Sequence, residues 1–201
     1  MTQLPTLSTD RLVLRPFNLS DAPSVERLAG VWEVADATLT IPHPYPAGGA
    51  ADWIATHRDA WAHRENLTLA ICASTTPDTL LGAISLKISE AHRHGEVGYW
   101  IGVDSWGHGY ATEAARAIIT YGFTDIGLHR AFGRHFTRNP ASGRVLQKLG
   151  MQHEGVQRDA CFRWGKFESV VMYGVLAAEW DAGPDTHAGQ SKPPTQPGTC
   201  M

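Results

Sequence analysis

The stretch EVGYWIGVDSWGHGYATEAARAI, residues 96–118, decides the fold expected for this chain. Apolar and polar residues alternate in its first part, which predicts a strand over 95–103. Gly107 and Gly109 then form a turn, and small apolar residues at helical spacing predict a helix over 111–126. The first amides of such a helix lack partners, and the helix dipole makes that end positive. The segment therefore predicts an anion-binding turn that suits a pyrophosphate.

Two common phosphate-binding motifs do not fit this turn. A P-loop requires Gly-Lys-Ser or Gly-Lys-Thr, and neither occurs anywhere in the chain. A dinucleotide fingerprint requires a third glycine in an early strand–helix–strand unit. Here Thr112 follows the two glycines, and the turn lies past the midpoint of the chain. On these residues alone, a tight turn without a ligand remains the alternative.

Outward from this segment, the chain alternates between strand and helix signals. Three prolines and two glycines predict a loop over 33–48. Asn139 followed by Pro140 predicts the capped start of a short helix that stops at Gly150. Further strands are predicted over 12–15, 67–73, 80–88, 131–137, 151–157 and 169–176, and further helices over 20–32 and 50–64. The expected fold class is therefore α/β (α+β) with a mixed sheet.

Composition limits the classes of function. The chain has 201 residues, of which 43% are hydrophobic and 18% charged, so it has room for one globular domain and a tail. Its formal net charge of -3 argues against a nucleic-acid-binding surface. No apolar stretch approaches the ~18 residues of a membrane helix, and the first residues lack the pattern of a secretory leader. We therefore expect no nucleic-acid or membrane partner and a cytoplasmic location.

Cysteines and histidines show no metal or disulfide pattern. Cys72, Cys161 and Cys200 are odd in number and far apart, which excludes a disulfide framework and a CxxC zinc site and favours a reducing compartment. The 10 histidines include no HExxH motif, so no metal site is predicted. Residues 181–201 are rich in proline and glycine, which predicts a flexible tail with Cys200 as an exposed thiol.

Three separated motifs resemble those of one family. Residues 106–111, WGHGYA, match the loop [Gln/Arg]-x-x-Gly-x-[Gly/Ala] except that Trp106 replaces Gln or Arg. Two further motifs are LSTDRLVLRPF at 7–17 and LHRAFGRHFTRNPASGRVLQKLGMQHEG at 128–155. Together they resemble the GCN5-related N-acetyltransferases (GNAT), in particular the RimJ/RimL-like ribosomal-protein N-terminal acetyltransferases. The resemblance covers 7–178 and implies a GNAT domain there, with a mostly antiparallel central sheet, flanking helices and splayed central strands.

The resemblance also implies chemistry: acetyl-CoA as donor and direct attack of a primary amine on the thioester. The expected acceptor is the α-amine of a protein or peptide N-terminus. A small-molecule amine (antibiotic, polyamine or amino acid) is the alternative, and a non-catalytic acyl-CoA sensor is the second; a homodimer is compatible with either enzyme. His108 stands where the group frequently has Lys or Arg. The implied cofactor contacts are Trp100, Ile101, Val103, Trp106, Gly107, His108, Gly109, Tyr110, Ala111, Thr112, Asn139, Ser142 and Lys148.

Three side chains are candidates for the acetyl-transfer chemistry. Glu96 is the first candidate for a general base acting through water, because it starts the strand that would carry the thioester and shares a face with Trp100. An exposed carboxylate or a salt-bridge partner is the alternative for Glu96. Some relatives carry a carboxylate where this chain has Cys161, so Asp159, two residues earlier, is the second candidate. Ser142, in the first turn of the capped helix, is expected to stabilise the leaving thiolate, unless it only starts the helix.

The region expected to bind the acceptor, about 25–55, contains few charges, so no acidic groove for a polycationic acceptor is apparent. Trp53 and Trp61 lie at nearly helical spacing, and we favour core packing over an acceptor-lining role for both. Arg134 is expected to face solvent or a charge partner.

Overall fold

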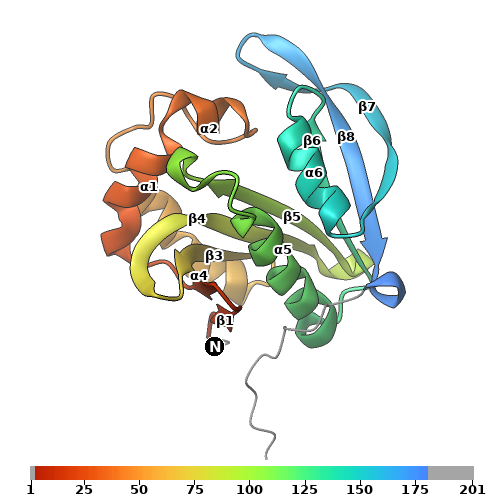
Figure 1. Ribbon diagram of the computed structural model, residues 1–201, viewed down its shortest axis with the longest axis horizontal. Coiled ribbons are helices and arrows are strands. Elements are labelled where there is room, and N and C mark those ends of the chain that lie inside the picture. Colours follow the sequence, from red (N-terminus) through yellow and green to blue (C-terminus); the bar gives the residue numbers. More distant parts are fainter. Residues whose placement is uncertain (1–2, 181–201) are drawn as a thin grey trace, which may run out of the picture.

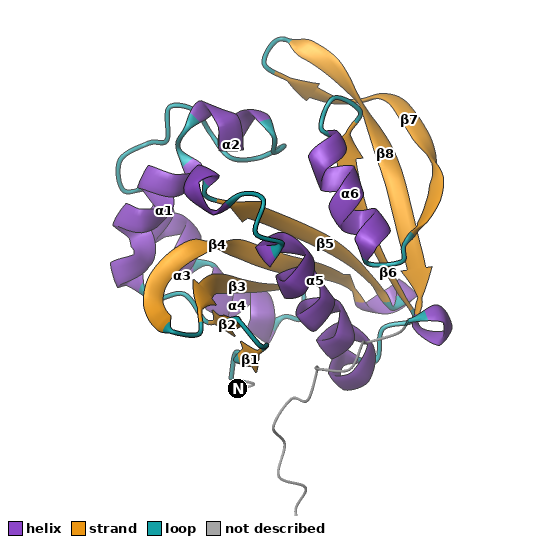
Figure 2. Cartoon of the chain, in the orientation of Figure 1, coloured by secondary structure: helices purple, strands orange, loops and turns teal. Residues whose placement is uncertain are grey.

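The computed structural model describes residues 3–180, and these form an eight-stranded mixed sheet with helices against both faces (Figures 1 and 2). The strands follow the order β1-β2-β3-β4-β5-β6-β8-β7, in which only β5 and β6 are parallel. They are β1 (Leu7–Ser8), β2 (Leu12–Arg15), β3 (Asn66–Ala73), β4 (Thr76–Ser89), β5 (His94–Ile101), β6 (Arg130–Phe136), β7 (Gln152–Arg163) and β8 (Lys166–Leu176). The α-helices are α1 (Ala22–Ala29), α2 (Trp32–Asp36), α3 (Gly49–Ala55), α4 (His57–Ala62), α5 (Tyr110–Tyr121) and α6 (Pro140–Lys148). The predicted fold class is confirmed.

Period-two alternation along the central strands separates two cores. On one face of the sheet, Leu67, Ile84 and Val97 belong to the core that α5 covers. On the other face, Ala70 and Cys72 pack into a second core with residues of α1 and α3. Because successive side chains of a strand point to opposite faces, one set of strands supports both cores.

The sheet opens at its single parallel pair. Strands β5 and β6 share only three residue pairs, His94↔Arg130, Gly95↔Ala131 and Glu96↔Phe132. Beyond them the two strands diverge (Figure 2), while β5 stays paired with β4 as far as Gly82↔Ile101. Among residues 3–180, no strand pairs with the edge of β5 past Glu96, and the predicted splay is confirmed.

The segments around this opening follow the sequence signals closely. Strand β5 ends at Ile101, two residues before the predicted end, because Val103–Ser105 form a 3-10 turn. Helix α5 begins one residue earlier than predicted and continues as a π-helical turn, Gly122–Ile126. Helix α6 has the predicted cap, since the side chain of Asn139 accepts a 3.2 Å hydrogen bond from the amide of Ser142. Its capping geometry therefore follows from local sequence.

The predicted helix over 20–32 and the loop over 33–48 are wrong in detail. The chain forms a 3-10 turn at Leu19–Asp21 and then α1, which ends at Ala29 with Gly30 as its C-cap. Helix α2 follows within residues predicted as helix end and loop. Val34 and Ala35 of α2 are 2% and 0% exposed, so tertiary burial stabilises a helix of five residues that local propensity does not predict.

The predicted helix over 50–64 is two helices, α3 and α4, which meet at Thr56. The Thr56 hydroxyl donates a 2.7 Å hydrogen bond to the carbonyl of Trp53, a local bond of the kind that bends helices. The break separates the two tryptophans. Trp61 is 2% exposed and lies in the core as predicted. Trp53 packs against the second core, as predicted, and also lines the cleft between β5 and β6.

At the C-terminal end, the predicted strands over 151–157 and 169–176 extend into one long hairpin of β7 and β8. Among residues 3–180, no helix is both long and apolar enough to span a bilayer, and no three metal-ligating side chains cluster. The predicted tail, 181–201, and its Cys200 lie outside the described residues.

Candidate active site

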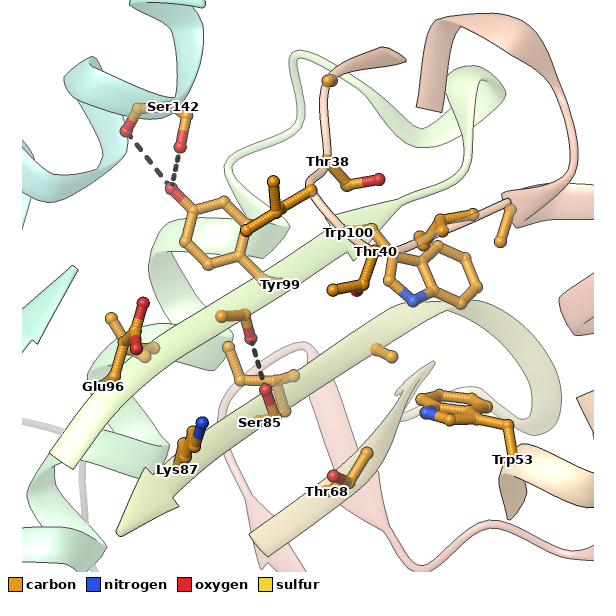
Figure 3. Close-up of a pocket in the computed structure, with 18 of the residues that line it drawn as sticks. Thr38, Thr40, Trp53, Thr68, Ser85, Lys87, Glu96, Tyr99, Trp100 and Ser142 are labelled. Carbon is orange, nitrogen blue, oxygen red and sulfur yellow. Dashed lines mark hydrogen bonds between the residues drawn. The ribbon is translucent and has the colours of Figure 1, made fainter. Parts of the chain in front are cut away.

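A cavity of about 660 Å³ lies where β5 and β6 part. Strands β3, β4 and β5 supply its floor, β6 and α6 supply one side, and the segment 37–42 with α3 supplies the other (Figure 3). The side chains that line it include Trp53, Thr68, Lys87, Glu96, Tyr99, Trp100, Arg134, Ser142 and Cys161. The splay of the sheet therefore creates a cleft that brings together residues from both halves of the chain.

The floor of the cleft is polar because of the strand register. Asn66, Lys87 and Glu96 are paired across β3, β4 and β5, and Thr68 and Ser85 form the next row. These residues alternate with the apolar ones that face the α5 core, so their side chains share the opposite face. One face of the central sheet is thus apolar core, and the other presents hydroxyl, amide and charged groups to the cleft.

Ser142 lies in the cleft with a partner that sequence inspection missed. The hydroxyl oxygen of Tyr99 is 2.8 Å from the Ser142 Oγ and 3.2 Å from its carbonyl oxygen (Figure 3). Burial raises the pKa of Tyr99 to about 12, so its hydroxyl stays protonated near neutral pH. The alternation along β5 places Tyr99 on the other face of the strand from Glu96. Only the packing of α6 against β5 brings its hydroxyl to Ser142.

Glu96 lies in the cleft and is also a salt-bridge partner, so both expectations for it are met in geometry. Its Oε1 is 2.7 Å from the Nε of Arg134, and its side chain is 24% exposed. Arg134 in turn has the charge partner expected from the sequence. The arrangement places a carboxylate and a guanidinium side by side at the open end of the parallel strand pair.

Asp159 and Lys148 are not brought to the cleft. Asp159 is exposed at a bulge of β7, with a left-handed φ of 49°, and its amide donates to the Ser169 Oγ at 3.0 Å. Lys148 ends α6, where its carbonyl accepts a hydrogen bond from Arg116. Cys161, by contrast, is buried and lines the cleft. Of the two carboxylates considered for the base, only Glu96 is in position.

The glycine-rich turn has the backbone conformation that an anion-binding loop needs. Gly107 and Gly109 have φ values of 79° and 81°, a left-handed region that favours glycine. Gly109 caps α5 without any side-chain hydrogen bond, so the first amides of the helix keep their capacity to bind a ligand. The indole nitrogen of Trp106 donates to the carbonyl of Ile101 at 2.7 Å and anchors the start of the turn.

An arginine from the first part of the chain supports this turn, and sequence inspection missed it. Arg11 donates to the carbonyl of His108 at 3.1 Å and to Glu113 of α5 at 2.8 Å. Its guanidinium also lies over the ring of Tyr110, at 5.1 Å from the centroid. Arg11 therefore places a cation beside the turn in which His108 replaces the usual basic residue. In the sequence, Arg11 stands out only as one residue of the motif at 7–17, which does not indicate its contact with the turn.

The β7–β8 hairpin holds the segment 37–42, which forms one side of the cleft. Arg163 donates to the carbonyls of Ala35, at 3.1 Å, and Ile41. The ring of Trp164 lies 5.0 Å from that of Trp32. We call these interactions the hairpin–α2 contact; they position the segment 37–42 from residues more than 120 positions away.

Comparisons with known proteins are consistent with this geometry. A profile described as an acetyltransferase (GNAT) domain matches residues 11–152. The N-acetyltransferase YoaA of Bacillus subtilis (strain 168), described as uncharacterized, is 30% identical over 173 residues, which are 86% of this chain and 97% of that protein. The [ribosomal protein uS5]-alanine N-acetyltransferase of Escherichia coli (strain K12) is 30% identical over 87 residues, 43% of this chain and 45% of that one.

A crystal structure of a probable acetyltransferase superposes with a TM-score of 0.78 at 25% identity. The superposed region covers 89% of this chain and 100% of the chain in that crystal structure. The sequence profile, the full-length relative and the solved structure therefore agree on one family.

Proposed function

Because the chain belongs to the GNAT acetyltransferase family, whose members use acetyl-CoA, we propose that this N-acetyltransferase acts on the α-amine of a protein or peptide N-terminus. The family assignment sets aside the non-catalytic sensor as an alternative. The charges that line the cleft are the basis for choosing a peptide acceptor over a small-molecule acceptor.

The donor side of the site fits acetyl-CoA, which supplies an acetyl group activated as a thioester. The turn at Gly107 and Gly109 presents backbone amides at the N-terminus of α5, the kind of group that binds pyrophosphate. A Cβ at Gly107 would meet no atom within 4 Å, so the space beside the turn is open to a ligand. The free edge of β5 beyond Glu96 offers main-chain groups along which the pantetheine arm would lie.

Residues on the two sides of β5 would handle the two protons of the reaction. The amine forms a new bond to the acetyl carbon and loses a proton, which Glu96 takes up through water. The carbon–sulfur bond breaks, and the Tyr99–Ser142 hydroxyl pair donates a proton or hydrogen bond to the leaving sulfur. A backbone amide near Trp100 or Ile101 would stabilise the oxyanion.

The single observation that favours a peptide acceptor is the charge of the cleft. Of the described lining residues, only Glu96 carries a carboxylate, and it faces the cations Lys87 and Arg134. A polyamine or aminoglycoside brings several positive charges, and like charges brought together are unfavourable. A peptide N-terminus brings one amine and otherwise neutral backbone, and the cleft is open enough to admit a chain end. The similarity to the uS5 N-acetyltransferase supports the same acceptor class.

The test is acetyl-CoA turnover, read by thiol release, against peptides that begin with Ala, Ser or Met, spermidine, an aminoglycoside and free amino acids. The matched control for each peptide is its N-terminally blocked form with any internal lysine kept. We expect thiol release with free N-termini only, and mass spectrometry should locate the acetyl group on the α-amine. Release with spermidine or the aminoglycoside alone would overturn the proposal and leave the family assignment intact.

A further inference from the structure

The floor of the cleft contains a cation that no described residue pairs with. Lys87 of β4 lies in register with Glu96 of β5 and shares its face of the sheet. The carboxylate of Glu96, however, pairs with Arg134 at 2.7 Å. Within residues 3–180, no hydrogen bond or ion pair of the Lys87 ammonium is found. Figure 3 shows this ammonium inside the cleft, beside Ser85.

The surroundings of Lys87 make the cleft positive. Among the described lining residues, the Lys, Arg, Asp and Glu side chains are those of Lys87, Arg134 and Glu96. Two cations and one carboxylate give a net charge of +1. A cleft whose fixed charges sum to a positive value attracts anionic groups and raises their local concentration. Because the Lys87 side chain is exposed to solvent, its ammonium is accessible to an anionic group that enters the cleft.

The neighbouring strand adds an unsatisfied acceptor. Asn66 of β3 is paired in register with Lys87, and its Nδ2 donates to the Thr68 Oγ1 at 2.9 Å. That bond orients the amide and leaves the buried Oδ1 of Asn66 without a hydrogen-bond partner among the described residues. The floor thus offers a hydrogen-bond acceptor next to a cation, which suits a group that carries both an N–H and a carboxylate, as an acidic amino-acid residue does.

We propose that Lys87 binds a carboxylate of the acceptor, so that the enzyme prefers amines with a carboxylate within one or two residues. The inference rests on the proposed peptide function and deepens it. Gly98 lies two residues beyond Glu96 on β5 and directly precedes Tyr99, whose hydroxyl pairs with Ser142. It is therefore about 7 Å along the strand from Glu96 and from Lys87, the cross-strand partner of Glu96. An extended peptide covers that distance in about two residues. On a peptide acceptor, that carboxylate is an acidic side chain at the first or second position.

The experiment compares acceptors that differ only in charge. Peptides beginning Ser-Asp and Ser-Asn, and Met-Glu and Met-Gln, form matched pairs, and free aspartate is compared with its amides. Wild type is measured beside Lys87→Gln and Lys87→Glu. Arg58→Gln serves as the control variant, because Arg58 is an exposed cation of α4 that does not line the cleft. Circular dichroism confirms that each variant is folded.

We expect kcat/KM to be roughly two- to fivefold higher for the acidic member of each pair. Lys87→Gln should abolish the preference, Lys87→Glu should reverse it in favour of the uncharged member of each pair, and Arg58→Gln should preserve it. The preference should also weaken as KCl is raised, because salt screens charge pairs.

Equal kcat/KM values for the paired peptides in wild type, or a preference that survives Lys87→Gln, would overturn the role of Lys87. If the proposed peptide function is wrong, no peptide will release thiol. A preference for free aspartate over its amides that depends on Lys87 would then support the carboxylate site and overturn the peptide acceptor.

Discussion

The proposed donor side of the cleft and the proposed acceptor wall are built in different ways. On the donor side, β5, the glycine-rich turn and α5 follow one another directly, and the groups offered to a ligand are backbone amides. The acceptor wall, 37–42, is a segment held by side chains from the distant β7–β8 hairpin. A backbone site depends on φ and ψ at a few residues, whereas the wall depends on long-range contacts. Variants in the two regions should therefore change different kinetic constants.

The largest effect is expected at the hydroxyl pair between the two regions. Tyr99→Phe should lower kcat by about 100-fold with little change in either KM, because a positioned proton donor contributes about that much. The matched control is Tyr173→Phe, since Tyr173 is also buried but its hydroxyl accepts a hydrogen bond from Gln147 outside the cleft. Steady-state kinetics with both substrates measures each constant. A kcat equal to that of the control variant would remove Tyr99 from the chemistry.

The next effect separates the donor side from the acceptor wall. Gly109→Val should raise the KM for acetyl-CoA by about 10- to 100-fold, because a branched side chain at a φ of 81° costs about 1–3 kcal/mol or displaces the turn. Acceptor KM should change much less. Gly150→Val introduces comparable strain at a φ of 76° after α6 and should leave the acetyl-CoA KM unchanged. Equal shifts of both KM values in Gly109→Val would show that the two sides are not independent.

Two arginines test the same division with smaller effects. Arg11→Gln removes the hydrogen bond to the His108 carbonyl and should raise only the acetyl-CoA KM, by about threefold. Arg163→Gln weakens the hairpin–α2 contact and should raise only the acceptor KM, by about fivefold. The double variant should show both shifts independently, because the sites share no partner. A donor effect of Arg163→Gln would contradict the assignment of the hairpin to the acceptor wall.

The smallest effect concerns the stability of the acceptor side. His57 is 5% exposed, and its ring lies against Phe17 and Trp53 without a hydrogen bond to either nitrogen from the described residues. Burial lowers the pKa of His57 from 6.5 to about 4. The unfolded chain therefore binds a proton more readily between these two values, so the free energy of unfolding falls as the pH drops below about 6.5.

Between pH 7 and 5.5 this loss should be about 1 kcal/mol. Urea unfolding at both pH values should show the loss in wild type and not in His57→Phe. His63→Gln, at an exposed position just after α4, should retain the wild-type dependence. An unchanged pH dependence in His57→Phe would assign the acid sensitivity to other groups.

Sequence signals predicted the donor side well because they are local. Alternation in β5, left-handed glycines at 107 and 109, and the Asn139 cap of α6 each specify backbone conformation within a few residues. Helices on the acceptor side are short, and local preference for them is weak. The burial of α2 and the break at Thr56 were therefore missed, and with them the placement of Trp53 in the cleft.

The sequence by itself predicted the family, the glycine-rich turn before a helix, Glu96 at the start of a strand and Ser142 in the first turn of a capped helix. Only the tertiary structure decided which side chains meet: Tyr99 with Ser142, Glu96 with Arg134 rather than Lys87, and Arg11 with the His108 carbonyl. It also left Asp159, which lies at a bulge of β7, outside the set of residues that line the cleft. The physical reason is that backbone conformation responds to neighbouring residues, whereas side-chain partnerships depend on sheet register and on packing between segments far apart in the chain.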